Sequence, residues 1–311
     1  MTAPAVAANH APARNAKADR GVDRWAGLIE FYFRFHTVIV YIFLYLPIVV
    51  VVVFAFNGTD RVVTKWGGIS LKWFGAALQD EVVKTALANS FIVAIPNAII
   101  ATLVGTMAAL GLQRVGRKLK MTFDTLTYMS VIVPEIVIAL ATLVLFATSF
   151  DFLKSTFGMK LNFGYPTIIA AHVLFNLSLV LLLVRARLSG MDRSLTEASA
   201  DLFATPWRTF RQITFPQLLP AIVAGFLLSF TFSFDDFVIT TFTSGPGSST
   251  LPLFIFGQVR RGVTPETNAV ATMMLGLTLL LLLVGQMILV WQARRNGRRS
   301  TAAMAGVIAD A

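Results

Sequence analysis

The sequence contains no cysteine and few charged residues. With no cysteine among 311 residues, disulfides, thiolate metal sites and cysteine nucleophiles are excluded. The three histidines, His10, His36 and His172, lie far apart and show no metal-ligand spacing. Charged residues make up 14% of the chain, against about 25% in an ordinary soluble domain. This scarcity of charge, with 56% hydrophobic residues, predicts that lipid surrounds most of the molecule.

Long apolar runs predict about six membrane-spanning helices, since one span needs about 20 mostly apolar residues. Glu135 lies about twelve residues into the third run, which at 1.5 Å per residue places it about 18 Å deep, near the bilayer midplane. Asp235 and Asp236 lie in the fifth run. The sequence therefore predicts an all-α, polytopic membrane protein, with spans over residues 36–56, 85–113, 123–149, 164–184, 216–240 and 268–292.

The basic residues follow the predicted topology. Lys and Arg are concentrated in the two termini and in the gaps after the second and fourth spans, which predicts that both termini are cytoplasmic. The formal charge of +10 is therefore not interpreted as a nucleic-acid site. We expect a disordered cytoplasmic tail over residues 1–30, a transmembrane domain over 31–295 and a cytoplasmic tail over 296–311. The long outer loops, about 57–84 and 242–267, are predicted to be functional.

The predicted cytoplasmic loop over residues 188–216 has the pattern of two short helices. Ser194 and Glu197 fit a capping box, and Thr205 followed by Pro206 fits the start of a second helix, with a turn near 203–205. Apolar side chains in this loop suggest that a second protein covers it: Leu195, Leu202, Phe203, Trp207, Phe210 and Ile213. The alternative is an amphipathic loop on the lipid headgroups, with Glu197 serving only as a cap.

The same loop resembles the coupling loop of permease subunits in bacterial ABC importers. In that family the loop reads E-A-A, then any three residues, a glycine, any nine residues, an isoleucine, any one residue and finally L-P. The spacing here agrees, and the identities differ at Ser199, Phe203 and Phe215. The resemblance implies a docking surface for an ATPase subunit, formed by Glu197, Ala198, Ser199, Asp201, Leu202, Phe203, Ile213 and Pro216.

Further motifs over roughly residues 35–292 resemble the polyamine branch of these permeases, most closely the second permease subunit of putrescine and spermidine importers. They include Pro134-Glu135-Ile136, Phe234-Asp235-Asp236-Phe237 and Ser244-Gly245-Pro246-Gly247. The resemblance implies a type I importer permease in the bacterial inner membrane, paired with a homologous permease. It also implies two ATPase subunits that use ATP, a periplasmic substrate-binding protein, and neither enzymatic activity nor a bound cofactor in this chain.

Carboxylates inside the membrane are costly and usually functional. On a continuous helix Ser229, Ser233, Asp236 and Thr240 would share one face. Carboxylates attract ammonium groups, and aromatic faces add ~0.5–2 kcal/mol by cation–π contact. We therefore predict that a cation path is lined by Asp235, Asp236, Glu135, Ser233, Ser229 and Phe234. Two alternatives stay open: the acids pair with Arg or Lys of the partner permease, or they cap a broken helix.

Other function classes have less support in the sequence. An importer for another small organic solute fits the same features, and a proton-driven secondary transporter would use the three acids as a relay. No phosphate loop of the form GxxxxGK[ST] occurs. An intramembrane enzyme is disfavoured, because the sequence offers no nucleophile–base pair for it. His172 is interpreted as a residue that packs or joins helices.

Overall fold

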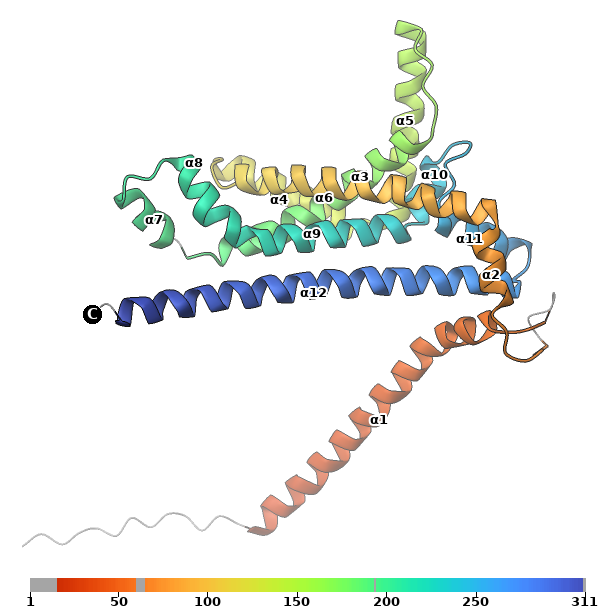
Figure 1. The fold of residues 1–311 in the computed structure, drawn as a ribbon, viewed down its shortest axis with the longest axis horizontal. Helices are drawn as coiled ribbons and strands as arrows, with labels where there is room; N and C mark the ends of the chain where they lie inside the picture. The colour runs from red at the N-terminus through yellow and green to blue at the C-terminus, as the bar shows by residue number, and fades with distance from the viewer. Residues whose placement is uncertain (1–15, 60–64, 193, 310–311) are drawn as a thin grey trace, which may run out of the picture. The chain divides into compact units, whose positions relative to one another are not determined.

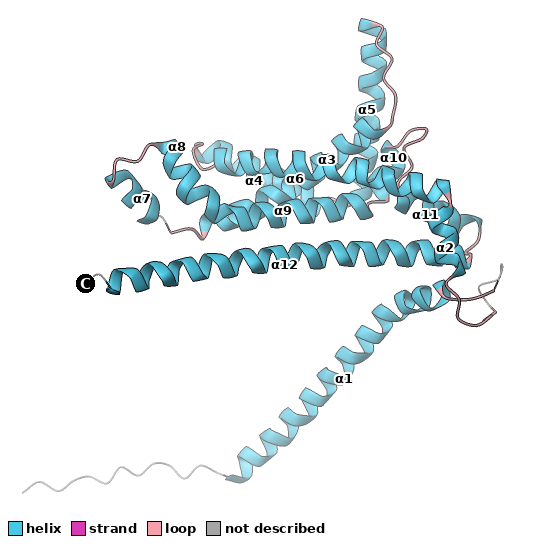
Figure 2. Cartoon of the chain, viewed as in Figure 1, coloured by secondary structure: helices cyan, strands magenta, loops and turns pink. Residues whose placement is uncertain are grey.

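The structure is a computed structural model that describes residues 16–59, 65–192 and 194–309, with side chains described between 28 and 291. All regular secondary structure in this part of the chain is helical (Figure 2), which confirms the all-α prediction. In chain order the elements are α1 Ala16–Ala55, α2 Lys72–Gln79, α3 Glu81–Gly111, α4 Arg117–Ile132, α5 Glu135–Phe157, α6 Tyr165–Ser189, α7 Ser194–Asp201, α8 Pro206–Thr209, the π-helical turn η1 Phe210–Thr214, α9 Phe215–Asp235, α10 Val238–Thr243, α11 Leu251–Arg261 and α12 Pro265–Ala309.

Six helical segments of the described chain are long and apolar enough to cross a membrane, as predicted. Shorter helices or loops separate each segment from the next. The fifth segment includes α8 and η1 as well as α9. The segments are Leu28–Ala55, Glu81–Gly111, Glu135–Phe157, Tyr165–Ser189, Pro206–Asp235 and Pro265–Trp291.

The chain divides into two compact units, residues 1–53 and 54–311. Within the first unit α1 begins at Ala16, so residues 16–30 are helical where the sequence predicted a disordered tail, whereas 1–15 lie outside the described residues. In the second unit α12 extends to Ala309, through most of the predicted tail over 296–311. No proline interrupts either stretch, and both are rich in Ala and Arg, which favour helix.

Three helices of the second unit, α3, α6 and α9, form its core and run side by side (Figure 1). Small residues allow them to approach closely, as is common between membrane helices. A Cβ atom on Gly105 of α3 would lie 2.9 Å from the Val180 Cβ of α6, and one on Gly225 of α9 would lie 3.3 Å from the Val180 Cγ1. Val180 is therefore the point at which the three helices meet.

The predicted third span is not one helix but two. Helix α4 ends at Ile132, and Val133 is extended, with φ −62° and ψ 131°. Pro134 causes this break, because its ring disfavours helical backbone in the preceding residue and it has no N–H to donate. Glu135 therefore lies at the first position of α5, which corrects the prediction that it lies about twelve residues inside a continuous span.

The predicted fifth span is interrupted in the same way. Helix α9 ends at Asp235, Asp236 is extended with φ −66° and ψ 131°, and α10 begins at Val238. The Asp236 carboxylate accepts hydrogen bonds from the backbone N–H groups of Ile239 (3.3 Å) and Thr240 (2.7 Å). An aspartate that bonds the backbone ahead of it competes with helix continuation, so Asp236 both ends α9 and caps α10.

The loop between α6 and α9 contains the predicted pair of short helices, α7 and α8. Thr205 is the N-cap of α8, and its hydroxyl accepts from the Arg208 N–H (3.4 Å). The backbone N–H of Ser194 donates to the Asp192 carboxylate (2.9 Å). The turn after α7 is a Schellman motif: Ala204 N–H donates to the Ser199 carbonyl (3.1 Å) and Phe203 N–H to that of Ala200 (2.9 Å).

Candidate functional site

Asp235 and Asp236 are adjacent in sequence but lie in opposite environments. Asp235 is the last residue of α9 and is exposed, and its carboxylate accepts a hydrogen bond from the Thr278 hydroxyl of α12 (3.1 Å). Asp236 is 7% exposed. Its Oδ2 accepts from both the backbone N–H and the hydroxyl of Thr240, each at 2.7 Å. The structure therefore leaves Asp235 open to a ligand and commits Asp236 to the protein.

His172 of α6 is the centre of the buried polar cluster around Asp236. It is 1% exposed. Its Nδ1 lies 2.7 Å from the Ser233 hydroxyl, and its Nε2 lies 3.0 Å from Asp236 Oδ2 and 3.2 Å from the Thr240 hydroxyl. The imidazole thus joins α6 to α9 and α10, which agrees with its interpretation as a helix-joining residue.

The remaining residues of the predicted polar stripe are inside the helix core. Ser229 is 0% exposed, Ser233 3% and Phe234 1%. Phe234 packs against Phe91 of α3, with ring centroids 5.1 Å apart, and the Ser229 carbonyl accepts from the Asn97 amide (3.0 Å). These three residues contact neighbouring helices and are not accessible to a ligand. They hold the end of α9 in place.

Glu135 is exposed, and its carboxyl group lies beside that of Asp236 and interacts with it. The two helix breaks are therefore neighbours in space. Two adjacent carboxyl groups repel when both are charged, and a cation or a shared proton relieves that repulsion. Helices α5 and α10, which follow the breaks, pack together through Ala139 and Ile239.

Helix termini of both signs meet at this place. Helices α4 and α9 end at the breaks with partial negative charge, whereas α5 and α10 begin there with partial positive charge. The termini therefore offset one another in part, and the exposed carboxylates Glu135 and Asp235 are what make the site suited to a cation.

The predicted docking loop presents its apolar residues outward. Leu202 is 81% exposed and Phe203 96% exposed, and Glu197, Ala198 and Asp201 are also exposed. Ser199 is buried, and its hydroxyl lies 2.7 Å from that of Thr209, which ties α7 to α8. Ile213 is half-buried in η1, and Pro216 is exposed in the first turn of α9.

Phe203 has φ 55°, in the left-handed region. Glycine is the residue that adopts this conformation without strain, and glycine is usual at this position of the resembled motif. The turn therefore has at Phe203 the left-handed conformation that glycine would adopt without strain, although the residue is not glycine. An exposed aromatic ring held in this conformation marks the tip of the loop.

Residues 101–298 match the model of a family described as the inner membrane component of binding-protein-dependent transport systems. The chain belongs to this family. It is 40% identical over 224 residues to the putrescine transport system permease protein PotI of Escherichia coli K12, covering 72% of this chain and 78% of PotI. It is 34% identical over 234 residues to the spermidine/putrescine transport system permease protein PotC of the same strain, covering 75% of this chain and 84% of PotC.

Solved structures support the same fold. The permease-like fold matches a chain of a bacterial ABC transporter that imports the acidic polysaccharide alginate, with TM-score 0.73, 14% identity, and coverage of 87% of this chain and 98% of that chain. A second structure of a bacterial alginate transporter, in complex with a periplasmic protein, matches with TM-score 0.65 and 17% identity over 91% of this chain and 96% of that chain. This inner-membrane component therefore has the architecture of an ABC importer permease.

The sequence pointed to Glu135 and Asp235, but it did not predict the contact between His172 and Asp236. One signal was present: an ionisable residue in a charge-free membrane helix requires a polar partner. His172 and Asp236 are 64 positions apart, and sequence spacing does not connect residues on different helices.

Proposed function

We propose that the chain is a permease subunit of an ATP-driven importer for polyamines, with putrescine as the first substrate to test. The observation that carries the proposal is the pair of exposed carboxylates, Glu135 and Asp235, at two adjacent helix breaks. The names of the relatives PotI and PotC support the substrate class. A diamine has an ammonium group at each end, so two separated carboxylates give it two weak contacts, and weak contacts allow passage.

The proposal includes the partners expected for such an importer. A homologous permease would complete the path opposite Glu135 and Asp235, two ATPase subunits would dock on the loop around Phe203, and a periplasmic protein would deliver substrate. Both termini and the docking loop would lie in the cytoplasm, as the distribution of basic residues favours. The outward-facing Leu202 and Phe203 support docking, because an exposed apolar tip gains stability when a partner covers it.

The docking loop is mechanically connected to the carboxylates. Helical structure runs without a gap from Pro206 through η1 to Asp235. A displacement of α7 and α8 by the ATPase would therefore be transmitted along α9 to its end. In this mechanism the step that uses ATP occurs outside the chain, and α9 carries its effect to the substrate site.

Two aromatic rings lie beside the helix break. Phe237 follows Asp236, and its ring centroid lies 4.2 Å from that of Phe256 in α11. The Arg260 guanidinium lies over the Phe256 ring, 4.7 Å from its centroid, and its charge would repel a substrate ammonium group there. The proposed aromatic contact with substrate is therefore the Phe237 ring alone.

The experiment is uptake of labelled putrescine into proteoliposomes that contain this chain and its genomic neighbours, with and without enclosed ATP. We expect ATP-dependent uptake. Glu135→Gln and Asp235→Asn should each reduce it about tenfold, which corresponds to the loss of about 1.4 kcal/mol. Asp151→Asn is the matched control, because Asp151 is an exposed carboxylate further along α5.

Two outcomes would contradict the proposal. Uptake that persists without ATP and collapses with a protonophore would identify a proton-driven transporter. Uptake of another solute, with none of putrescine or spermidine, would keep the importer and reject the polyamine assignment.

A further inference from the structure

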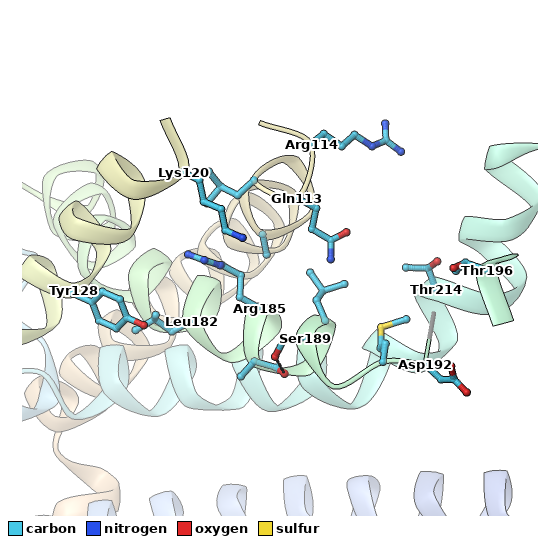
Figure 3. A pocket seen from close by; sticks show the side chains of 15 residues that line it. Gln113, Arg114, Lys120, Tyr128, Leu182, Arg185, Ser189, Asp192, Thr196 and Thr214 are labelled. Carbon is cyan, nitrogen blue, oxygen red and sulfur yellow. Dashed lines mark hydrogen bonds between the residues drawn. The ribbon is translucent and has the colours of Figure 1, made fainter. Parts of the chain in front are cut away.

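A polar cavity lies at the opposite end of the bundle from the helix breaks. Its volume is about 760 Å³, and it lies where the end of α3, the start of α4 and the end of α6 meet the docking loop (Figure 3). Gln113, Arg114, Lys120 and Arg185 line one part of it, and Thr196 of α7 and Thr214 of η1 line another. The cavity therefore joins the membrane bundle to the elements proposed to receive the ATPase.

Three basic residues line the cavity, Arg114, Lys120 and Arg185, against one lining carboxylate, Asp192. Arg185 forms an ion pair with Asp124, and Lys120 is attracted to the same carboxylate. Figure 3 shows the charged ends of Lys120 and Arg185 side by side, with the Gln113 amide directed into the same space. Two neighbouring cations that share one carboxylate favour the binding of an anion between them.

The inner wall of the cavity is apolar. The half-buried Leu182 and Leu188 line it, and behind them lie the buried Ala109 and Leu112 of the core cluster around Val180 and Val184. A small soluble anion would use only the basic side of this space. A molecule with an anionic head and a hydrocarbon chain would use both sides.

We propose that this cavity binds the phosphate headgroup of an anionic membrane phospholipid. Basic pockets between membrane helices on the cytoplasmic side are suited to such headgroups. The Lys120 ammonium and the Arg185 guanidinium bind the phosphate oxygens, and the Gln113 amide donates a further hydrogen bond. An acyl chain lies along Leu182 and Leu188. That this cavity faces the cytoplasm rests on the proposed function, in which both termini and the docking loop are cytoplasmic.

The proposal gives the lipid a structural role in the docking loop. Because Thr196 and Thr214 line the same cavity as Lys120 and Arg185, the headgroup bridges the bundle to α7 and η1. A membrane that lacks anionic lipid would leave the docking loop less firmly held. Lipid composition would then affect the response to ATP without changing the carboxylate site.

The test uses the full chain, purified and delipidated, titrated with phosphatidylglycerol, phosphatidylcholine or inorganic phosphate. Bound lipid is counted by native mass spectrometry, and thermal unfolding is followed in parallel. We expect phosphatidylglycerol to bind and raise the unfolding temperature. Lys120→Gln should weaken its binding about fivefold, whereas Lys120→Arg and the matched control Lys118→Gln should retain it, because Lys118 is an exposed lysine of α4 that does not line the cavity.

Three results would overturn the proposal. Equal binding of phosphatidylcholine would show that charge is irrelevant, and equal weakening by Lys118→Gln would show a diffuse surface effect. Equal stabilisation by inorganic phosphate would identify a soluble anion as the ligand. Glu135→Gln separates this proposal from the proposed function, because it should reduce uptake about tenfold and leave lipid binding unchanged.

Discussion

Replacing Asp236 by asparagine tests whether this residue holds the helix break together or contacts the substrate. The substitution removes a buried charge and turns one acceptor oxygen into an NH₂ group. Four donors surround the carboxylate: the Thr240 N–H and hydroxyl at 2.7 Å, His172 Nε2 at 3.0 Å and the Ile239 N–H at 3.3 Å. An amide oxygen can replace Oδ2, but its NH₂ group then faces the Ile239 N–H.

The expected destabilisation follows from these bonds. A hydrogen bond to a charged group contributes about 1.5–3 kcal/mol and a neutral one about 0.5–1.5, so three weakened bonds cost about 3 kcal/mol. The unpaired Ile239 N–H adds about 1–3 kcal/mol, and removing a buried charge offsets part of the total. We expect Asp236→Asn to lower the free energy of unfolding by about 2–4 kcal/mol, or the unfolding temperature by about 5–10 °C.

The assay is thermal unfolding of the full chain in detergent, read by tryptophan fluorescence, followed by uptake normalised to folded protein. Asp235→Asn is the matched control, because it is exposed and accepts one bond from Thr278. It should change the stability by less than about 1 kcal/mol and still reduce uptake. If Asp236→Asn unfolds at the wild-type temperature while Asp235→Asn is destabilised, the assignment of the two roles is wrong.

Two further predictions concern packing and the docking loop. Gly105→Ala should destabilise the chain by about 1–3 kcal/mol in the same unfolding assay, because the added methyl group meets Val180. Gly75→Ala is the control and should not destabilise it, because no atom lies within 4 Å of its Cβ position. Equal effects of the two substitutions would contradict the close packing of α3 and α6. Phe203→Gly should relieve about 1–2 kcal/mol of left-handed backbone strain but reduce uptake and ATPase stimulation, since the exposed ring is lost; unchanged coupling would show that the ring makes no contact with the ATPase.

Much of the architecture could be predicted from the sequence, because length and apolarity decide which segments span a membrane. The six spans and the turn at Phe203 follow from local sequence. The helix breaks were harder to predict, since hydropathy continues through both of them. Pro134 gave a local signal for the first break. The second break depends on Asp236 capping α10, and the sequence did not predict it because the spacing of Ser229, Ser233, Asp236 and Thr240 also fits one face of a continuous helix.

The candidate site was predicted in part, and for a physical reason. Carboxylates in a membrane segment are conspicuous, so Glu135 and Asp235 could be identified by residue type alone. Whether a polar side chain faces a path or a neighbouring helix depends on contacts between distant segments. Ser229 and Ser233 have the same spacing in either case, and only the positions of α3 and α6 show that they are buried.

The adjacent breaks after α4 and α9 also define a hinge. Two residues link the helices at each break, Val133 and Pro134 at the first and Asp236 and Phe237 at the second. Beyond the breaks, α5 and α10 share packed side chains. Both helices also touch α6, since Ala171 belongs to the same cluster and the Thr240 hydroxyl lies 3.2 Å from His172 Nε2. Under the proposed function, a rotation of α5 about its break would exchange such contacts and would change the spacing between Glu135 on α5 and Asp235 on α9, the two proposed substrate contacts.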